Sequence, residues 1–339
     1  IRQHEVNIEQ NTFVNQRFGS IDVSYTRGLY IRNNNFTSNT TISSFKAIDL
    51  SSSDTYTDIS GNAISLSSAG SGMFLDGLNY STNPGTAHVY NNMIIAAGTG
   101  LGLGIWNGEH VFTSYNNIYA SGSGPAIELA GGDSLYVRNN VLVSNSGRAF
   151  SSFSLTPFVV SDYNDLYSIT GDLGYWNSIL YPTFAEWQAG TTFDSNSINI
   201  DPEFVSGTDL HVLADTLDGA GIPIAGISED FDGNPRNALM PDIGADEIGA
   251  NDDDAGVLAI LPEMPFARGI QDVKAIVRNY GGNTITSVDI HWVLNNVPQT
   301  PITYTGSLPS LQEDTITLGT VTFLLSTPYT IKSWTTDPN

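Results

Sequence analysis

The chain has 339 residues, of which 40% are hydrophobic, so it is long enough to bury one large core or two medium ones. With 35 acidic residues against 12 basic ones, its formal net charge of −23 argues against nucleic acid or an anionic membrane surface as a partner. No apolar run approaches the roughly 20 residues that a transmembrane helix needs, so membrane insertion is not expected either. The absence of cysteine excludes disulfides, thiolate metal sites and a cysteine nucleophile.

An internal repeat begins near the N-terminus. An asparagine followed two positions later by a large apolar residue recurs at spacings of 23 to 30 residues. This spacing suits one three-strand turn of a β-solenoid with loops of variable length. The seven pairs are Asn11/Phe13, Asn34/Phe36, Asn62/Ile64, Asn92/Ile94, Asn117/Tyr119, Asn140/Leu142 and Asn164/Leu166. Because the chain begins inside a repeat, we expect further N-terminal coils upstream.

Each repeat also carries two more short segments in which apolar and polar residues alternate, such as residues 21–23 and 30–32. Stacked coils align equivalent residues into inward apolar ladders and outward polar ladders. We therefore predict an all-β fold, with a right-handed parallel β-helix of seven coils over residues 1–167. The asparagines are expected at equivalent bends, where a short amide tolerates left-handed backbone and bonds to its neighbours in the ladder. The seven apolar partners should form one inward ladder.

The repeat stops after Tyr167. Thr183 and Glu186 form a capping box, which predicts a short helix starting there. A solenoid end needs covering because the last coil exposes a strand edge and the apolar interior. We assign this capping role to residues 168–250.

Strand and turn signals resume beyond the acidic residues 251–254. They predict an immunoglobulin-like β-sandwich over residues 251–339. The expected strands lie near residues 257–260, 273–277, 288–294, 316–318 and 329–334. A further strand is expected beyond Asn339, so this domain is interpreted as truncated.

Short motifs in both C-terminal regions match known modules. The first region holds Asp-Pro-Glu-Phe-Val at 201–205, Asp-Leu-His-Val at 209–212, Asp-Phe-Asp-Gly-Asn-Pro-Arg at 230–236 and Pro-Asp-Ile-Gly-Ala-Asp-Glu at 241–247. It resembles the C-terminal cap of exported Bacteroidetes-type β-helix proteins, which include chondroitinase-B-like polysaccharide lyases. The second region holds Val-Arg-Asn-Tyr-Gly at 277–281 and Trp-Val-Leu-Asn at 292–295, and resembles the adhesion-related CARDB domain. The cap resemblance implies architecture rather than catalysis, since such caps terminate enzymes and non-enzymes alike.

Aligning the middle segments of successive coils gathers acidic and aromatic residues on one outward face. One row holds Asp22, Asp49, Phe74, Gly104 and Glu128, and the next holds Ser24, Ser51, Asp76, Trp106 and Ala130. Carboxylates on neighbouring or alternate coils are expected roughly 5 or 10 Å apart, which brackets the spacings of glycosidase pairs. The catalytic candidates for a hydrolase are Asp49, Asp76 and Glu128. The candidate substrate contacts are Trp106, Asp76, Glu128 and His110. Alternatively, the carboxylates simply solvate the sheet face.

Other chemistries have weaker support. A lyase needs a basic residue beside a group that neutralises the substrate carboxylate, and the basic residues of the repeat are scattered over different coils. Asp230, Asp232 and Asn234 alternate in a turn with the oxygen-rich pattern that calcium favours, although Arg236 offers these groups another partner. Calcium is thus a weak candidate cofactor. The five histidines show no metal-ligand spacing, so no transition-metal site is predicted.

These features favour a secreted or cell-surface bacterial protein. We expect an adhesin-like, glycan-contacting β-helix without catalysis, joined to a sandwich spacer in a longer chain. Its expected partners are a polysaccharide or cell-surface glycan and other domains of that chain. The two alternatives are a carbohydrate-active enzyme, either a polysaccharide lyase or a glycoside hydrolase, and a protein–protein assembly module.

Overall fold

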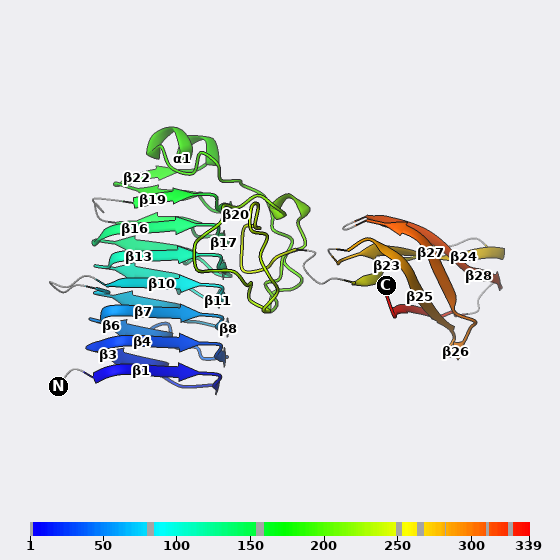
Figure 1. The fold of residues 1–339 in the computed structure, drawn as a ribbon, viewed down its shortest axis with the longest axis horizontal. Coiled ribbons are helices and arrows are strands. Elements are labelled where there is room, and N and C mark those ends of the chain that lie inside the picture. The colour runs from blue at the N-terminus through cyan, green and yellow to red at the C-terminus, as the bar shows by residue number, and fades with distance from the viewer. Residues whose placement is uncertain are drawn as a thin grey trace. The chain divides into compact units, whose positions relative to one another are not determined.

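The computed structural model describes residues 3–79, 85–153, 159–248, 253–262, 268–281, 283–309, 312–324 and 328–339. The chain divides into two compact units, Ile1–Glu247 and Ile248–Asn339. Each unit has its own apolar core, and among the described residues the two cores share no member. Figure 1 shows the strands of the first unit stacked like rungs from β1 to β19.

Three sheets run along the stack in the described part of the first unit, and successive coils contribute parallel strands to each. Sheet A has seven strands: β1 (Gln3–Glu9), β4 (Thr26–Arg32), β7 (Asp54–Ser60), β10 (Thr86–Tyr90), β13 (Glu109–Ser114), β16 (Asp133–Arg138) and β19 (Val159–Asp162). Sheet B has seven: β2 (Thr12–Val14), β5 (Asn35–Ser38), β8 (Ala63–Leu66), β11 (Met93–Ala96), β14 (Asn117–Ala120), β17 (Val141–Ser144) and β20 (Asp165–Ser168).

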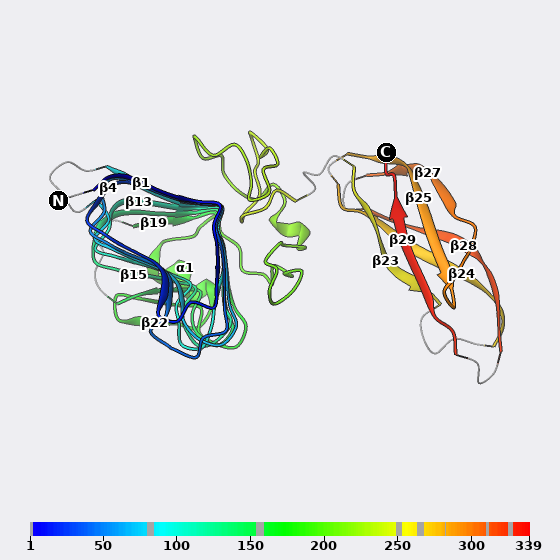
Figure 2. The same cartoon turned by 90° about the horizontal axis from the view of Figure 1, so that it is seen from below.

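Sheet C has eight strands in the described residues: β3 (Gly19–Ser24), β6 (Lys46–Ser51), β9 (Ser71–Asp76), β12 (Leu103–Trp106), β15 (Ile127–Ala130), β18 (Phe150–Ser152), β21 (Gly174–Trp176) and β22 (Ile179–Tyr181). The last strand, β22, is antiparallel to β21 and ends the regular stacking. Figure 2 looks nearly along the stack and shows the coils superposed. The predicted parallel β-helix of seven coils is confirmed.

The inward ladder of sheet B differs from the prediction in one coil. Ile118 pairs with Ile94 on one side and Leu142 on the other, and its side chain is fully buried. Tyr119, which the repeat assigned to this ladder, points to the opposite face and pairs with Ile95 and Val143. The other six predicted apolar residues share the ladder.

The asparagine ladder shifts by one residue in the same coil. Asn116, not Asn117, donates through Nδ2 to Asn140 Oδ1 at 2.9 Å and accepts from Asn92 Nδ2 at 2.9 Å. The same amide-to-amide bond links Asn34, Asn62 and Asn92 in order. The left-handed backbone conformation, which was predicted for the ladder asparagine, is found instead at the residue before it, such as Asn33, Gly61 or Tyr115. The ladder asparagine instead satisfies buried backbone groups at the bend.

The predicted helix is confirmed as α1 (Phe184–Thr191), with the capping box of Thr183 and Glu186 in place. Trp187 of α1 is fully buried, and its ring lies 5.1 Å from that of Phe150 in the last coils. Its indole donates to Asp194, which also accepts from Asn164 at the end of the asparagine ladder. This segment therefore closes the solenoid interior, as predicted.

Residues 198–247, here called the flank segment, do not cover the end of the stack. They run as loops, with one 3-10 turn (Asp215–Leu217), along the outer side of sheet B, where Figures 1 and 2 both show them beside the coils. Leu210 and Ala245 pack against Met93 and Ile95, so β11 is buried on both faces. The prediction that residues 168–250 cap the solenoid end is thus corrected for the flank segment.

The second unit is a set of antiparallel strands compatible with a β-sandwich, described here by itself. One sheet contains β23 (Ala255–Leu261), β24 (Gly269–Asn279) and β28 (Glu313–Phe323), and the other contains β25 (Ile285–Leu294), β26 (Val297–Pro298), β27 (Ile302–Leu308) and β29 (Ile331–Thr336). Val273, Ile290 and Trp292 belong to its buried core. All five predicted strands are present, whereas β26 and β27 were not predicted. Across the described residues of the chain, no helix has the length and apolarity required to span a membrane.

Candidate functional site

The outward rows of sheet C have the register that the repeat predicted. Asp49 pairs with Asp22 and Phe74, and Gly104 pairs with Phe74 and Glu128. In the next row, Trp106 pairs with Asp76 and Ala130. The predicted acidic and aromatic face therefore exists, with the exception of His110. That exposed residue lies on β13 of sheet A, so it does not join the other substrate candidates.

The side chains of this face are engaged with one another. Lys46 Nζ lies 2.9 Å from Asp49 Oδ2 and 3.8 Å from the centre of the Phe74 ring. Phe74 in turn meets Trp106 edge-on, with ring centres 5.0 Å apart. Trp106 Nε1 donates to Glu128 Oε1 at 3.2 Å. Trp106 is therefore held within a packed row and is not a separate flat platform.

The carboxylates of sheet C are poorly arranged for glycoside hydrolysis. Burial raises the pKa of Glu128, while the Trp106 hydrogen bond and Arg148 oppose that rise. However, Asp76 lies two strands away from Glu128 and two residues further along, which places their Cα atoms about 12 Å apart. The Cα atom of Asp49 lies about 14 Å from that of Glu128. A catalytic pair needs about 5 to 9.5 Å between carboxyl groups. Asp49 and Asp76 are about 8 Å apart by the same measure, but they are bound to Lys46 and Asn107 respectively.

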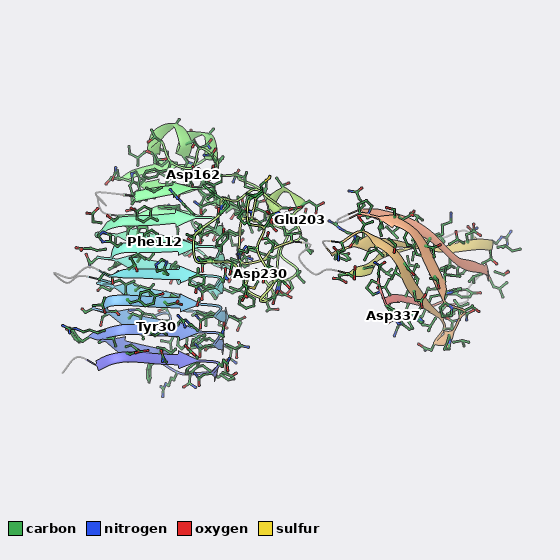
Figure 3. The ribbon with its side chains drawn as sticks, in the orientation of Figure 1. Tyr30, Phe112, Asp162, Glu203, Asp230 and Asp337 are labelled. Atoms are coloured by element: carbon green, nitrogen blue, oxygen red, sulfur yellow. The ribbon has the colours of Figure 1, made fainter. Side chains whose placement is uncertain are left out.

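A second outward face, on sheet A, was not singled out in the sequence. Five aromatic side chains follow one another across consecutive strands and form what we call the aromatic stripe. Its members are Tyr30, Tyr56, His88, Phe112 and Tyr136. Figure 3 labels Tyr30 and Phe112 over the strands of this sheet. The spacing of the repeat carried the signal, because Tyr30, His88, Phe112 and Tyr136 occupy equivalent positions of their coils.

The rings of the stripe are close and, toward its later coils, nearly parallel. The His88 and Phe112 centres are 5.1 Å apart with an interplanar angle of 12°, and Phe112 and Tyr136 are 4.5 Å apart at 3°. Each side chain is partly exposed. Burial lowers the pKa of His88, although Asp58 opposes this, so its ring is uncharged at neutral pH. The later coils of the stripe thus carry a packed row of aromatic rings, whereas at its N-terminal end the Arg32 guanidinium lies 4.5 Å from the centre of the Tyr30 ring.

Asp58 anchors the N-terminal end of the stripe. In the row that holds Tyr30 and His88, Asp58 occupies the position between them where an aromatic residue would continue the row. Its side chain is only 3% exposed. Arg32 donates to it twice, at 3.1 and 2.7 Å, and Ser60 donates at 2.8 Å. The hydroxyls of Tyr56 and Tyr90 lie 3.5 and 3.4 Å from Asp58 Oδ2. This carboxylate is fully engaged in positioning its neighbours, so it is poorly available as a nucleophile or base.

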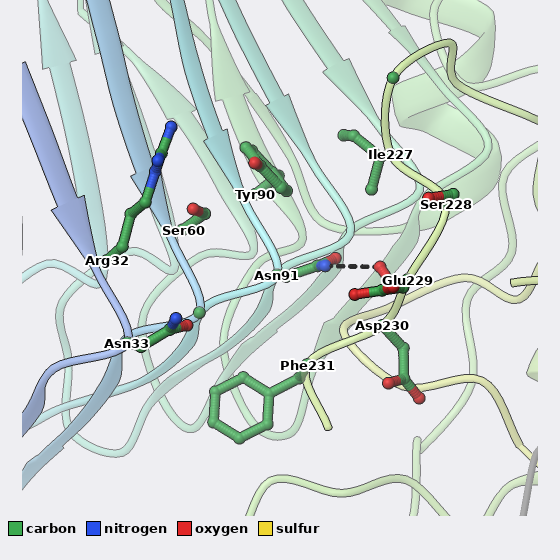
Figure 4. A pocket seen from close by; sticks show the side chains of 12 residues that line it. Arg32, Asn33, Ser60, Tyr90, Asn91, Ile227, Ser228, Glu229, Asp230 and Phe231 are labelled. Atoms are coloured by element: carbon green, nitrogen blue, oxygen red, sulfur yellow. Dashed lines mark hydrogen bonds between the residues drawn. The ribbon is translucent and has the colours of Figure 1, made fainter. Parts of the chain in front are cut away.

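A polar cleft of about 360 Å³ adjoins this end of the stripe. Arg32, Ser60 and Tyr90 line one side, and residues 226–231 of the flank segment line the other. Figure 4 shows the two sides facing each other, joined by the hydrogen bond from Asn91 Nδ2 to the Glu229 backbone oxygen at 2.7 Å. The cleft therefore brings hydrogen-bonding groups to the edge of an aromatic surface.

The predicted calcium turn is arranged around Asp230. Its carboxylate accepts from the backbone amides of Asp232, Asn234 and Glu247, at 2.9, 2.8 and 3.1 Å. The Asn234 side chain also donates to it, at 3.2 Å. Arg236 does not neutralise this turn by pairing with Asp230, but binds Glu247 and backbone oxygens of residues 244–246. Asp230 thus serves the turn itself, and calcium as a weak candidate ligand of this turn stays a prediction.

No family model, no curated protein and no solved structure matches this chain.

Proposed function

We propose that this protein contacts neutral glycans through the aromatic stripe of sheet A and does so without catalysis. The observation that carries the proposal is the row of five partly exposed rings on consecutive strands. Because His88, Phe112 and Tyr136 stack on one another, they present mainly ring edges to solvent. A continuous row of such edges offers an apolar surface to the apolar face of a sugar, and its repetition along the stack suits a chain of sugars. The polar cleft beside Tyr90 supplies hydrogen-bonding groups at one end of that path.

Charge selects the kind of glycan. The net charge of −23 repels uronic-acid and sulfated chains, and Lys46 is the only lysine before Lys274. Neutral sugars escape this repulsion. Because the stripe is an open face, we expect dissociation constants on the order of millimolar, as stacking there has to offset the lost freedom of the ligand.

The resemblance of the flank segment to caps of exported β-helix proteins, and of the second unit to the CARDB domain, supports placement outside a bacterial cell. There the second unit would act as a spacer in an adhesin-like chain. The same stripe is also compatible with an assembly module that binds another protein. Binding of purified neutral glycans separates these two functions, because a protein-binding module would not retain them.

The test is affinity electrophoresis of the full chain in gels that contain neutral glucans or xylans, beside gels with alginate, pectin or chondroitin. We expect retardation only by neutral polysaccharides. Phe112→Ala and Tyr136→Ala should abolish it, whereas Trp106→Ala on sheet C should leave it unchanged. Retardation that depends on Trp106 and not on Phe112, or no retardation by any neutral glycan, would overturn the proposal.

The second candidate is a carbohydrate-active enzyme, favoured by the raised pKa of Glu128. A hydrolase would release new reducing ends, and a lyase would produce the absorbance of unsaturated uronates. We expect neither product from any of the polysaccharides above. Turnover that disappears in Glu128→Gln or Asp76→Asn would replace the non-catalytic proposal with the enzyme.

A further inference from the structure

Three loops of the flank segment bring one histidine and two carboxylates together. His211 Nε2 lies 3.0 Å from Asp232 Oδ2 and 3.8 Å from Asp246 Oδ1. All three potential ligand atoms lie within 4.8 Å of one another. The residues are 14 to 35 positions apart in the chain, which explains why no ligand spacing was visible in the sequence.

Asp246 directs a buried carboxylate oxygen that accepts no hydrogen bond toward this cluster. The residue is 6% exposed, and its Oδ2 accepts from the Val212 amide at 3.0 Å and from Asn117 Nδ2 at 3.3 Å. Its Oδ1 is buried, accepts no hydrogen bond and faces His211. Leaving a buried carboxylate oxygen without a partner is costly, and a cation bound to that oxygen would remove the cost.

The histidine is oriented as a metal ligand is. Asp209 Oδ1 makes a very short contact with His211 Nδ1 and also accepts from the His211 backbone amide. A carboxylate on one ring nitrogen fixes the tautomer and directs the other nitrogen toward the metal. Here the other nitrogen is Nε2, which contacts Asp232 Oδ2 and faces Asp246 Oδ1.

The separations also fit a single ion. Atoms bound at about 2.1 Å to one ion lie about 3.0 to 3.5 Å apart at octahedral or tetrahedral angles. The observed 3.0 and 3.8 Å to His211 Nε2 need small side-chain shifts, and the Asp232 and Asp246 oxygens, which lie within 4.8 Å of each other, need to approach on binding. One imidazole nitrogen with two carboxylates suits Zn²⁺ better than Ca²⁺, which prefers six or more oxygens. A cavity of about 250 Å³, lined by Met93, Ile95, His211 and Phe231 among others, leaves space for a further ligand.

We propose that His211, Asp232 and Asp246 bind a divalent transition cation of the Zn²⁺ class, with Asp209 as the positioning residue for His211. This site is independent of the proposed glycan surface. The competing arrangement is a metal-free cluster in which a protonated His211 bridges the three carboxylates. Burial lowers the pKa of His211. The nearby carboxylates of Asp246, Asp209 and Asp232 outweigh this effect and raise the His211 pKa to about 9.

The experiment is Zn²⁺ titration of the chelator-stripped full chain, read by competition with a chromophoric chelator and by metal analysis after gel filtration. We expect one Zn²⁺ per chain, a higher melting temperature on binding and no comparable effect of Ca²⁺. Co²⁺ should give visible d–d absorption bands at the same stoichiometry.

Asp232→Asn removes an exposed ligand without disturbing the core, and should weaken Zn²⁺ binding at least about tenfold. Asp246→Asn should do the same or more. The matched control is Glu229→Gln, an exposed carboxylate on the same loop, which should leave binding unchanged. Substoichiometric Zn²⁺, or an affinity that is equal in Asp232→Asn and Glu229→Gln, would overturn the site in favour of the metal-free cluster. If Asp246→Asn fails to fold, the Asp232→Asn comparison still decides.

Discussion

Glu128 shows how a single side chain on an outward sheet face can be unfavourable for stability. It is 7% exposed, and burial raises its pKa above the usual value near 4.5. For a group whose pKa is raised in the folded state, stability is fully present below the unfolded pKa and falls as pH rises through the folded pKa. Charging Glu128 therefore costs the fold stability as the pH rises toward neutrality.

We predict that the unfolding free energy of the Glu128→Gln variant increases relative to that of the unmodified protein as the pH rises from 4 to 7. Glutamine keeps an oxygen to accept from Trp106 but carries no charge, so the pH-dependent loss disappears. Urea denaturation at both pH values measures the difference in unfolding free energy. The exposed Glu203→Gln serves as the control and should show no such trend. A difference that falls with pH would mean that Arg148 outweighs burial and stabilises the charged form.

The residue rows of sheet C were predictable because solenoid register follows directly from repeat alignment. The hydrogen-bond partners of Asp58 were not predictable. Arg32 and Tyr90 are 26 and 32 residues away in the sequence, and their side chains reach Asp58 only because the coils stack. The same holds for His211, Asp232 and Asp246, which lie on irregular loops. Periodicity places residues on strands, but it carries no information about loop-to-loop distances.

The asparagine ladder is the element that links the coils at their sharpest bend. Asn116 alone donates to the Val89 and Ser114 backbone oxygens and to Asn140, and it accepts from the Asn92 amides. All of these groups are buried. Removing one amide therefore leaves several buried polar atoms without partners.

We expect Asn116→Ala to lower the unfolding free energy by at least about 3 kcal/mol, because each orphaned buried group costs about 1 to 3 kcal/mol. Chemical denaturation of the variant measures this loss. Asn11→Ala, at an exposed rung of the same ladder, should cost less than about 1 kcal/mol. Equal losses at the two positions would show that buried ladder bonds contribute no more than exposed ones.

The shift from Asn117 to Asn116 has a simple cause. Two asparagines stand side by side in this coil, and an apolar residue follows each of them two positions later, Ile118 or Tyr119. The alignment of asparagines alone cannot choose between them. Burial decides, because a tyrosine in the inward ladder would bury its hydroxyl without a partner, whereas Ile118 fits between Ile94 and Leu142.

At the scale of the whole molecule, the flank segment explains why β11 and β17 of sheet B are apolar on both sides. Met93, Ile95, Val141 and Val143 alternate with inward residues, and all four are buried. Such continuous apolar strands are typical of sheets covered on both faces, a signal in β11 and β17 that was available in the sequence. What covers them was not predictable, because the flank segment has almost no regular structure.

The two units should unfold as separate cooperative bodies, since their buried cores share no described residue. We predict two calorimetric transitions for the full chain. Expressed separately, residues 1–247 and residues 248–339 should each fold and each reproduce one of those transitions. We expect agreement within about 3 °C, which corresponds to less than about 1 kcal/mol of coupling between the units. Trp292→Ala, a core change in the second unit, should lower only one transition of the full chain. A single transition, or a variant that lowers both, would show that the units stabilise each other.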